Sequence, residues 1–581
     1  MTASEQNTAS QSSPTFKVIV NGNAIPQEYN LVSMMILHEV NRLSTARLIF
    51  LDGEASKNDF PLSNKPDFLP GATVKIEAGY NGENEDVFQG IVIRQSVKLN
   101  NNKSSFLIVE CRHKAVTMTK VRKSKIFLEQ KDSDIFSTLA GPHQVTLEND
   151  DTTVEYPEMV QFHCSDWDFL ISRAEANGFL VWGEGEKLMI KKPSLSGEGV
   201  MELKFGVNLL EFDSDLDGRW QFESVKAYGW DPSTHEPLES ESSFSDTLGQ
   251  GNASSGDLAG KTGDKACTIT HGGAINDSEL RVWADAQQLK FALSRIRGRA
   301  KCKGASTLKP GKLVTLAGMG DRFNGKAFLS GVRHEINQGN WHTDVAFGLS
   351  PKSFIREHDV NDNPASGLLP GVNGLQIGIV SQLEKDPLGE DRVMVKIPMT
   401  DKDADGVWAR QALLDAGKER GSFFRPEIGD EVILGFLNDD PRHPVILGML
   451  NSSKLPAVTQ AKDTNHFKGF VTRAKMKIWF DDENKTLEIS TDAGNSIRLD
   501  EKDKKIALKD QHGNEITMSK DGIVIKSIKD IKLDAASGKI GASGNEIESS
   551  ANSKLKLSGN GSAEMSSGGT TSIKGSMVQI N

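Results

Sequence analysis

At 581 residues the chain is several times longer than a typical domain, so it must contain several domains. Hydrophobic residues at 37% and charged residues at 25% are typical of a globular chain, and no window approaches the ~20 consecutive apolar residues that a membrane-spanning helix needs. A net charge of −11 without a basic stripe excludes phosphate-dominated binding, so we expect no nucleic-acid partner.

Residues 1–14 form a polar N-terminal tail without the charged and then apolar segments of a secretion signal, which predicts synthesis in the cytoplasm. The cysteines lie far apart in the sequence, at Cys111, Cys164, Cys267 and Cys302. They have neither the paired spacing of a zinc site nor the density of a disulfide scaffold. We therefore expect reduced, mostly buried thiols and no cofactor or metal.

Residues 15–368 contain an internal repeat. Residues 70–90 and 310–331 both begin with Pro-Gly, continue as an alternating strand, and reach a second strand after a glycine-containing loop. Each segment is a turn followed by paired strands, so the repeat has a structural reason that needs no ligand. It predicts two related β-barrels.

Helices interrupt this β pattern at two places. Ser165, with Asp168 three residues later, resembles a capping box, and Gly178 stands where that helix would end. A second helix is predicted from about 278 to 297, with an apolar stripe typical of core packing. From about 231 to 276 the chain is rich in Ser, Gly and Asp without periodicity, which predicts a long loop.

Three short segments could be taken for chemical sites but fit structural roles better. The segment SGDLAGKT at 255–262 lacks the first glycine of a phosphate loop, and no apolar strand precedes it. His163 and Cys164 are adjacent on a strand and would point to opposite faces, which disfavours a metal or thiol site. Asp439 and Asp440, which could act as an acid–base pair on a glycan, precede prolines and favour a turn.

Residues 369–450 contain short strands punctuated by Gly and Pro, a pattern that predicts an OB-type barrel. Trp408 and Arg410 alternate along one of these strands, so a stacking or interface contact and a core position fit Trp408 equally well. Residues 451–480 are predicted to be a connector, too short for an inserted catalytic domain.

From 481 to 581 the sequence has no Phe, Tyr, Trp, Pro or Cys. Apolar pairs such as Leu487 and Ile489 recur up to Ile531 and Leu533, and apolar marks then return about every eight residues. One such strand per repeat buries too little apolar area to offset the entropy of ordering it. Three chains wound about one axis would complete the core, so the pattern favours a trimeric β-helix, with a single-chain solenoid as the alternative.

In this order the parts resemble the VgrG spike proteins of type VI secretion and related contractile injection systems, which are similar to a fusion of the hub and needle proteins of contractile phage tails. The resemblance covers nearly the whole chain. The resemblance is most specific in four places. These are residues 165–178, residues 206–210 together with VKAYGWDP at 225–232, the series of motif residues in the small barrel at 392–448, and the start of the predicted rod at 492–523, called the rod-entry motifs. The motif residues singled out as structural are Ser165, Asp168, Gly178, Trp408, Arg410, Gly429, Asp440 and Pro441.

The resemblance implies a mainly β fold. It divides the chain into an N-terminal tail (1–14), a phage hub-like domain of two β-barrels with helical insertions (15–368), an OB-fold barrel (369–450), a connector (451–480) and a C-terminal intertwined trimeric β-helix (481–581). A segment of the Y-H-Y-P-G type, familiar from many proteobacterial spikes, is not found. The choice between a type VI machine, an extracellular injection particle and a phage tail therefore stays open.

The function that the resemblance implies is mechanical and non-enzymatic. A homotrimer would join a hexameric tube and the baseplate or hub proteins, and sheath contraction would drive it through a target membrane; effector cargo, if any, would be another chain. The protein would be made in the cytoplasm, assembled into the injection particle, and then delivered or released outside the cell. A PAAR-like tip protein would dock on Gly575, Ser576, Met577, Val578, Gln579, Ile580 and Asn581. The alternative is a trimeric tailspike that binds or hydrolyses surface glycans, which the absence of Trp and Tyr after residue 480 disfavours.

Overall fold

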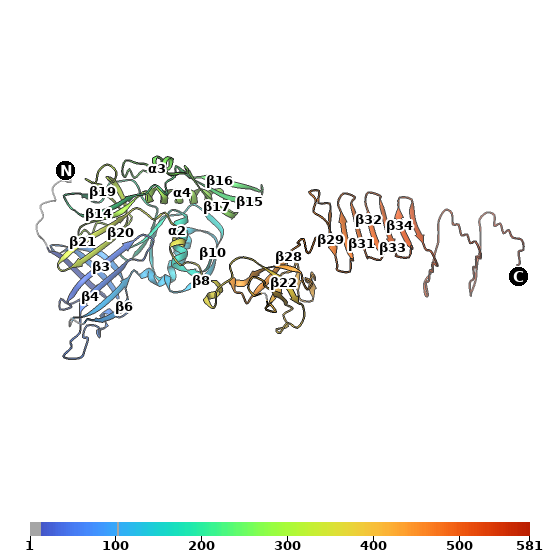
Figure 1. Ribbon diagram of the computed structural model, residues 1–581, viewed down its shortest axis with the longest axis horizontal. Helices are drawn as coiled ribbons and strands as arrows, with labels where there is room; N and C mark the ends of the chain where they lie inside the picture. Colours follow the sequence, from blue (N-terminus) through green and yellow to red (C-terminus); the bar gives the residue numbers. More distant parts are fainter. Residues whose placement is uncertain (1–12, 101–103, 402, 581) are drawn as a thin grey trace. The chain divides into compact units, whose positions relative to one another are not determined.

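The computed structural model of the protein describes residues 13–100, 104–401 and 403–580. Most of its elements are strands, so the predicted mainly β fold class is confirmed. The chain divides into a hub unit (1–373 with 438–441) and a rod unit (374–437 with 442–581), both traced in Figure 1. Of the tail predicted at 1–14, residues 1–12 lie outside the described residues, and Pro14 already begins a strand.

A thirteen-stranded sheet forms the body of the hub unit, counted over the described residues. Its first half comprises β1 (Pro14–Val20), β2 (Asn23–Ala24), β3 (Leu31–Glu39), β4 (Thr45–Leu51), β5 (Thr73–Tyr80), β6 (Glu83–Leu99) and β7 (Ser105–Arg112). Its second half comprises β13 (Glu202–Lys204), β14 (Leu209–Leu216), β18 (Ile296–Lys303), β19 (Leu313–Ala317), β20 (Gly325–Asn337) and β21 (Asn340–Phe347). Antiparallel pairing of β20 with β3 joins the halves, with His334 opposite Ile36.

Each half keeps its own apolar core although the sheet is continuous. Phe50, Phe68 and Phe88 are fully buried in the first core, and Leu329 and Phe347 in the second. Alternation along the strands directs Phe50, Phe88, Leu329 and Phe347 to one face of the sheet, and Phe68 reaches the first core from the 3-10 turn Pro66–Phe68. The two cores therefore correspond to the two halves of the internal repeat.

The repeated Pro-Gly segments make the same backbone hydrogen bonds. The Gly71 amide donates to the Val92 carbonyl at 2.8 Å, and the Val92 amide donates to the Ala72 carbonyl at 2.9 Å. The Gly311 amide donates to the Leu329 carbonyl at 2.9 Å, and the Leu329 amide returns a bond to Lys312 at 2.9 Å. Both glycines have positive φ, 103° and 81°, so both repeats begin at an equivalent left-handed turn.

These equivalent glycines differ in what surrounds them, which gives a matched pair of variants. A Cβ on Gly311 would lie 2.7 Å from the Trp182 ring, whereas a Cβ on Gly71 would meet nothing within 4 Å. Both alanine variants strain a positive φ by about 1 kcal/mol, and Gly311→Ala adds a steric overlap of roughly 1–3 kcal/mol. We expect thermal unfolding of the full chain to show a clearly larger loss for Gly311→Ala; equal losses would contradict the contact with Trp182.

A helical insertion follows the first half of the sheet. Two helices, α1 (Asp132–Ala140) and α2 (Asp166–Ala176), pack with fully buried Phe136 and Leu170 in a separate core. Around them lie the ribbon of β8 (Arg122–Lys131) and β10 (Glu155–Ser165), the sheet of β9 (Thr146–Asn149), β11 (Leu180–Glu184) and β12 (Lys187–Lys191), and the 3-10 turns η2 (Lys114–Thr119) and η3 (Gly141–His143). The 3-10 turn η1 (Pro66–Phe68) belongs instead to the first half of the sheet, where Phe68 lies in the core.

A second insertion corrects the long loop predicted from 231 to 276. This region contains β16 (Glu236–Glu241), α3 (Ser255–Thr262) and β17 (Ala266–Ala274), and both strands flank β15 (Ser224–Asp231). The prediction was wrong because β16 and β17 are edge strands whose largely exposed residues show no alternation. The predicted helix at 278–297 is α4 (Asp277–Ser294); α5 (Phe354–Glu357) and the 3-10 turn η4 (Pro364–Gly367) follow later.

The rod unit begins with a closed barrel in the order β22-β23-β24-β28-β27. Its strands are β22 (Gln376–Gln382), β23 (Val393–Lys396), β24 (Val407–Gln411), β27 (Glu431–Phe436) and β28 (Pro444–Met449). Val395, Ala409 and Leu434 are fully buried inside it. The short strands β25 (Ala416–Gly417) and β26 (Arg420–Gly421) form a hairpin outside the barrel, and the 3-10 turn η5 spans Leu437–Asp439.

A seven-stranded antiparallel meander follows the barrel (Figure 1). Its strands are β29 (Phe467–Val471), β30 (Lys477–Asp481), β31 (Thr486–Ser490), β32 (Ser496–Asp500), β33 (Lys505–Lys509), β34 (Glu515–Ser519) and β35 (Gly522–Lys526). The first two strands lie within 451–480, so the predicted connector extends too far and the sheet begins before residue 481. It also contains aromatic residues that the predicted rod lacked, Phe467, Phe470, Trp479 and Phe480.

Beyond β35 the chain is extended and forms no strand up to residue 580, so the predicted pair of Ile531 and Leu533 does not lie in a strand of this chain. Within residues 531–580, all of them described, one backbone hydrogen bond forms, from the Gly538 amide to the Ala535 carbonyl at 3.2 Å. The Gly569 amide donates to Ser567 Oγ at 3.1 Å, and the other described backbone groups of this segment are open to partners outside the chain.

Candidate functional site

The meander of the rod unit carries two continuous rows of apolar side chains on one face. Each strand from β30 to β35 contributes two residues of the same parity, because side chains alternate between the faces of a strand. Across the ladder Ile489 lies opposite Ile497, and Ile497 lies opposite Leu508. The first row is Ile478, Ile489, Ile497, Leu508, Ile516 and Ile525; the second row is Phe480, Leu487, Leu499, Ile506, Met518 and Ile523.

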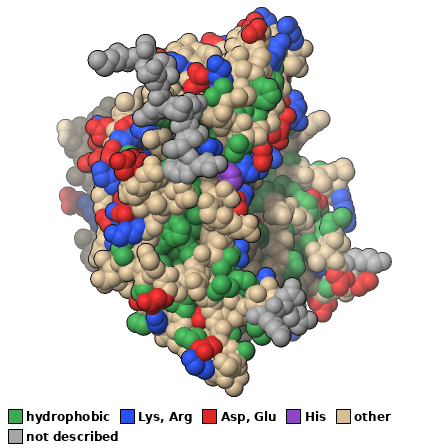
Figure 2. All heavy atoms as spheres, turned by 90° about the vertical axis from the view of Figure 1, so that its left-hand side faces the viewer, with side chains coloured by type: hydrophobic (Ala, Val, Ile, Leu, Met, Phe, Trp, Pro, Cys, Tyr) green, Lys and Arg blue, Asp and Glu red, His purple; other side chains and the backbone are tan. Residues whose placement is uncertain are grey.

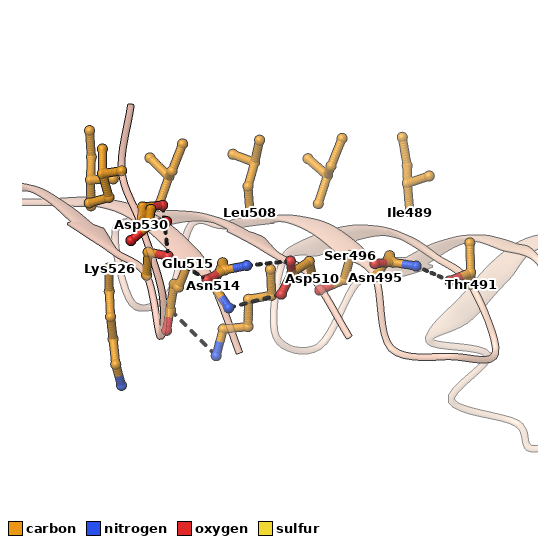
Figure 3. Close-up of a pocket in the computed structure, with 16 residues that line it drawn as sticks. Ile489, Thr491, Asn495, Ser496, Leu508, Asp510, Asn514, Glu515, Lys526 and Asp530 are labelled. Carbon is orange, nitrogen blue, oxygen red and sulfur yellow. Dashed lines mark hydrogen bonds and ion pairs between the residues drawn. The ribbon is translucent and has the colours of Figure 1, made fainter. Parts of the chain in front are cut away.

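This face is open in the single chain. Ile489 and Leu508 project from the same side of the sheet in Figure 3, above a groove of about 580 Å³. Ile497 is 42% exposed and Ile506 is 40% exposed. Isolated apolar side chains on a surface are ordinary, but a contiguous apolar face of this kind marks an interaction surface. The meander therefore lacks a covering layer.

Turns at one edge of the meander are tied together by asparagines. Asn514 donates to Asp510 Oδ2 at 2.7 Å, and Asn495 donates to Thr491 Oγ1 at 3.2 Å, as Figure 3 traces. Asn495 Oδ1 also accepts the Gln511 amide of the next turn on that edge, at 3.1 Å. Each turn is thus fixed both internally and to its neighbour. The rod-entry motifs read from the sequence form these turns.

The residues predicted to dock a tip protein lie in the extended terminal segment. Gly575, Ser576, Met577, Val578, Gln579 and Ile580 are exposed, and Asn581 lies outside the described residues. Met577 is 80% exposed and Ile580 is 85% exposed. Their exposure is compatible with docking, which remains a prediction.

The hub motif at 165–178 connects α2 to the elements around it. The Ser165 hydroxyl accepts the Asp168 amide at 3.1 Å and donates to the Asp168 carboxylate, so Ser165 is the N-cap of α2. Gly178 lies just beyond the end of the helix, with φ 71°, and a Cβ there would lie 3.2 Å from Ala286 of α4. Ser165 thus stabilises the start of α2, and Gly178 ends the helix and allows α4 to pack closely against it.

Three charged residues of the same motif make contacts that sequence reasoning did not assign. Asp166 accepts hydrogen bonds from Gln161 at 3.0 Å and from His143 at 2.9 Å, and it pairs with Lys123. Burial opposes ionisation of this carboxyl, but these donors hold its pKa below the usual value. Glu175 pairs with Lys290 of α4, and Arg173 pairs with Asp132 of α1. No local pattern in the sequence indicates these distant partners.

The barrel residues of the rod unit have defined places. Trp408 is half-buried and Arg410 is exposed, while Ala409 between them points into the barrel core. Trp408 is therefore not a core residue, and of the two roles left open the outward-facing one fits. Gly429 has φ 92° in the turn before β27.

Asp439 and Asp440 lie in a turn that is itself part of the hub unit, and they do not form a catalytic pair. The Asp439 carbonyl accepts the Val372 amide at 2.8 Å, and Asn438 and Asp439 both have positive φ. Asp440, which precedes Pro441, is buried. This arrangement places the two carboxylates in a strained structural turn.

The thiols and histidines also fit structural roles. Cys111, Cys164 and Cys302 are buried and Cys267 is partly buried, all as free thiols. Burial raises the pKa of Cys111 and of Cys302 to about 12, so both stay protonated. His163 lies 3.3 Å from Asp362. Among the described residues no group of three or more His, Cys, Asp or Glu side chains is placed to hold a metal ion.

Two buried histidines predict acid sensitivity of the hub unit. Burial lowers the pKa of His113 to about 4 and of His334 to about 3, below about 6.5 in the unfolded chain. The unfolded state therefore takes up protons as the pH falls below 6.5 while the folded state does not. We expect each histidine to remove about 2 kcal/mol of stability between pH 7.5 and 5. Urea unfolding of wild type and of His113→Gln/His334→Gln checks this; an equal pH dependence for both proteins would contradict it.

The surface charges are mixed. On the face drawn in Figure 2, Lys and Arg side chains are interspersed with Asp and Glu, and apolar side chains gather between them. No helix in the described part of the chain has the length and apolarity needed to cross a membrane.

Comparison with known proteins places the chain in a family. A family model described as the Alg8 N-terminal domain matches residues 10–338, more than half of the chain. The chain belongs to this family. A second model, described as the type VI secretion system/phage-baseplate injector OB domain, matches residues 376–450, which are the closed barrel and its flanks.

A curated relative matches part of the chain. The type VI secretion system spike protein VgrG1b of Pseudomonas aeruginosa is 28% identical over 189 residues, which cover 30% of this chain and 24% of the relative. The aligned part thus spans about a quarter of that protein. Together with the OB-domain match, it confirms the resemblance to VgrG-type spike proteins that the sequence motifs indicate.

Solved structures to which the chain shows partial similarity include tail and secretion components. A prophage MuSo2 43 kDa tail protein from Shewanella oneidensis is 12% identical, with a TM-score of 0.44, 58% of this chain and 99% of that chain covered. An E. coli type VI secretion component, titled as similar to the phage T4 tail proteins gp27 and gp5, is 12% identical, with a TM-score of 0.40, 75% of this chain and 100% of that chain covered. Both TM-scores lie below 0.5.

Proposed function

We propose that the protein is the trimeric spike of a contractile injection machine, with no enzymatic activity of its own. The observation that carries the proposal is the open apolar face of the meander. Three copies that turn these faces toward a common axis would bury all twelve side chains of each copy. Side chains that are now about two-fifths exposed would each gain roughly 1 kcal/mol on burial.

The terminal segment supports the same assembly. Most of its described backbone groups make no hydrogen bond within the chain, and apolar residues such as Ile540, Ile547 and Ile573 are exposed along it. Winding with two further copies would pair these backbone groups between chains and bury the apolar residues. The shaft would then present no open strand edge.

The remaining parts of the proposal follow from the resemblance to VgrG-type spike proteins. The repeated halves of the hub unit would adapt a trimer to a hexameric tube and contact baseplate or hub proteins. Residues 575–581 would dock a PAAR-like tip protein, and effector cargo would be a separate chain. Sheath contraction would push the shaft through the target membrane, after cytoplasmic synthesis and assembly into the particle.

Electron cryomicroscopy of the purified full chain tests the proposal. We expect class averages with threefold symmetry in which one thin shaft emerges from three hub densities. Particles with a single hub density and no shaft would contradict it. Added PAAR-like protein is expected to give density at the far end of the shaft, and its absence would remove the tip-docking part alone.

A further inference from the structure

The ribbon of β8 and β10 in the hub unit contributes Phe127 to a core on one face and carries exposed apolar side chains on the other. On β8 and β10, Ile126 is 63% exposed, Leu128 is 62% exposed and Phe162 is 80% exposed. Val160, paired with Ile126 across the ribbon, is 50% exposed. These side chains form one outward face, whereas Phe127 points inward and is buried. We refer to residues 120–131 and 155–165 as the ribbon.

The backbone around Phe162 departs from regular strand geometry. The register of β10 against β8 shifts between Gln161 and Cys164, and His163 has φ 40°. Such bulges re-aim side chains and carry a local energetic cost for a non-glycine residue. Here the bulge holds Phe162 outward, where the hub unit itself gives it no packing partner among the described residues. Burial of Phe162 against another surface would offset the energetic cost of the bulge.

The ribbon has a net positive charge, with five basic residues, all within 120–131, and three acidic residues, Glu129, Glu155 and Glu158. Lys123 already pairs with Asp166, and Arg122 donates to backbone carbonyls. Lys120 and Lys125 are exposed, and Lys125 lies over the Phe127 ring at 5.0 Å rather than in an ion pair. A partner surface should therefore be apolar and acidic.

A surface of matching chemistry lies elsewhere on the hub unit. The strands β15 and β16 and the chain that follows, residues 224–246, which we call the wing, carry five acidic residues and no Lys or Arg from 231 onward. Glu236 and Glu241 are exposed, and Trp230 is 40% exposed with its ring stacked on His235 at 6.3 Å. The wing thus presents both an exposed aromatic side chain and exposed carboxylates.

We propose that in the assembled protein the ribbon of one copy docks on the wing of the next copy. The inference rests on the proposed trimer and adds a second interface to it. A closed ring of identical chains needs two different complementary patches on each copy, and the basic ribbon and the acidic wing are such a pair. Phe162 is the anchor of the contact and the charges set its orientation.

The position of the ribbon along the chain favours another copy as its occupant. Arg122 donates to the Val360 carbonyl at 2.7 Å and to the His163 carbonyl at 3.1 Å, which fixes the ribbon to the segment that ends the hub unit. Residue 360 precedes the rod unit by about fourteen residues, a reach of at most about 50 Å. Joining of three rods therefore keeps the three ribbons and wings at a high effective concentration.

Zero-length carbodiimide cross-linking of the full chain tests the contact. We expect peptides that join Lys120 or Lys125 to Glu236 or Glu241 in the bands of two- and three-chain mass, and not in the one-chain band. Phe162→Glu should reduce these peptides at least tenfold while light scattering still gives three chains. The matched control is Phe205→Glu, at an exposed phenylalanine of the hub outside both surfaces, which should leave them unchanged.

The outcomes separate this inference from the proposed function. A three-chain mass with the ribbon–wing peptides missing, or confined to the one-chain band, overturns the ribbon–wing contact and leaves the rod assembly intact. Unchanged cross-links in Phe162→Glu also overturn it. A one-chain mass for the wild type overturns the proposed trimer, and the contact between copies with it.

Discussion

Replacement of Ile525 by lysine is expected to convert the full chain from a trimer to a monomer. Ile525 lies on the apolar face of β35, opposite Ile516 of β34. In the proposed assembly the new ammonium group would enter a closed apolar core without an acceptor, at a cost of at least about 3 kcal/mol per copy. Because each of the three copies carries the lysine, the total destabilisation of the trimer is about three times the cost per copy. Light scattering of the purified variant measures the mass directly.

The neighbouring residue provides the control. Val524 lies on the opposite face of the same strand, and in the single chain it is 62% exposed compared with 55% for Ile525. A simple count of exposed area would therefore predict equal effects. We expect Val524→Lys to remain trimeric, because its side chain would point to solvent. Loss of the trimer in both variants, or in neither, would refute the assignment of the inner face.

Replacement of Arg173 by methionine is expected to cost the hub unit about 3–5 kcal/mol. The Asp132 side chain has no exposed area, and it accepts Arg173 Nε at 2.8 Å and Nη2 at 2.9 Å, with a third bond from Asn177 at 2.8 Å. Arg173 also lies over the Tyr156 ring at 4.9 Å. Without Arg173 a buried carboxylate would lose its counter-ion. Urea unfolding monitored by tryptophan fluorescence measures the loss.

Two further variants identify the cause of that loss. Arg219→Met removes a similar two-bond contact to Asp217, but the Arg219 side chain is 79% exposed, so we expect a loss below about 1 kcal/mol. The double variant Asp132→Leu/Arg173→Met removes both charges and should recover part of the stability. Equal losses for Arg173→Met and Arg219→Met would show that the buried ion pair is not the origin.

Local signals made much of the fold predictable. The cap formed by Ser165 and Asp168, the helix end at Gly178 and the Pro-Gly turns of the repeat each depend on residues within a few positions of one another. The strands of the barrel and of the meander after residue 481 follow from period-two alternation. The apolar face of the meander, which carries the proposed function, was therefore visible in the pairs such as Leu487 and Ile489.

Features that depend on distant partners were not predictable in this way. Asp132 and Arg173 are 41 residues apart, and neither has a local pattern that indicates the other. The strands β29 and β30 were missed because the last aromatic residues were taken as the boundary of the rod. Their pairing shows the reason for the error: Phe480 lies opposite Leu487 and continues the same apolar row. Composition changes at residue 481, but the sheet does not.

The native mass of the unmodified full chain tests the central claim most directly. One chain has a mass of 63.4 kDa, so light scattering should give about 190 kDa, with no change on dilution through the micromolar range. A chain ending at Leu450, without the meander and the terminal segment, should give a lower mass that depends on concentration. A stable mass near 63 kDa for the full chain would contradict the trimeric spike and leave the apolar face of the meander to be covered within a single-chain solenoid.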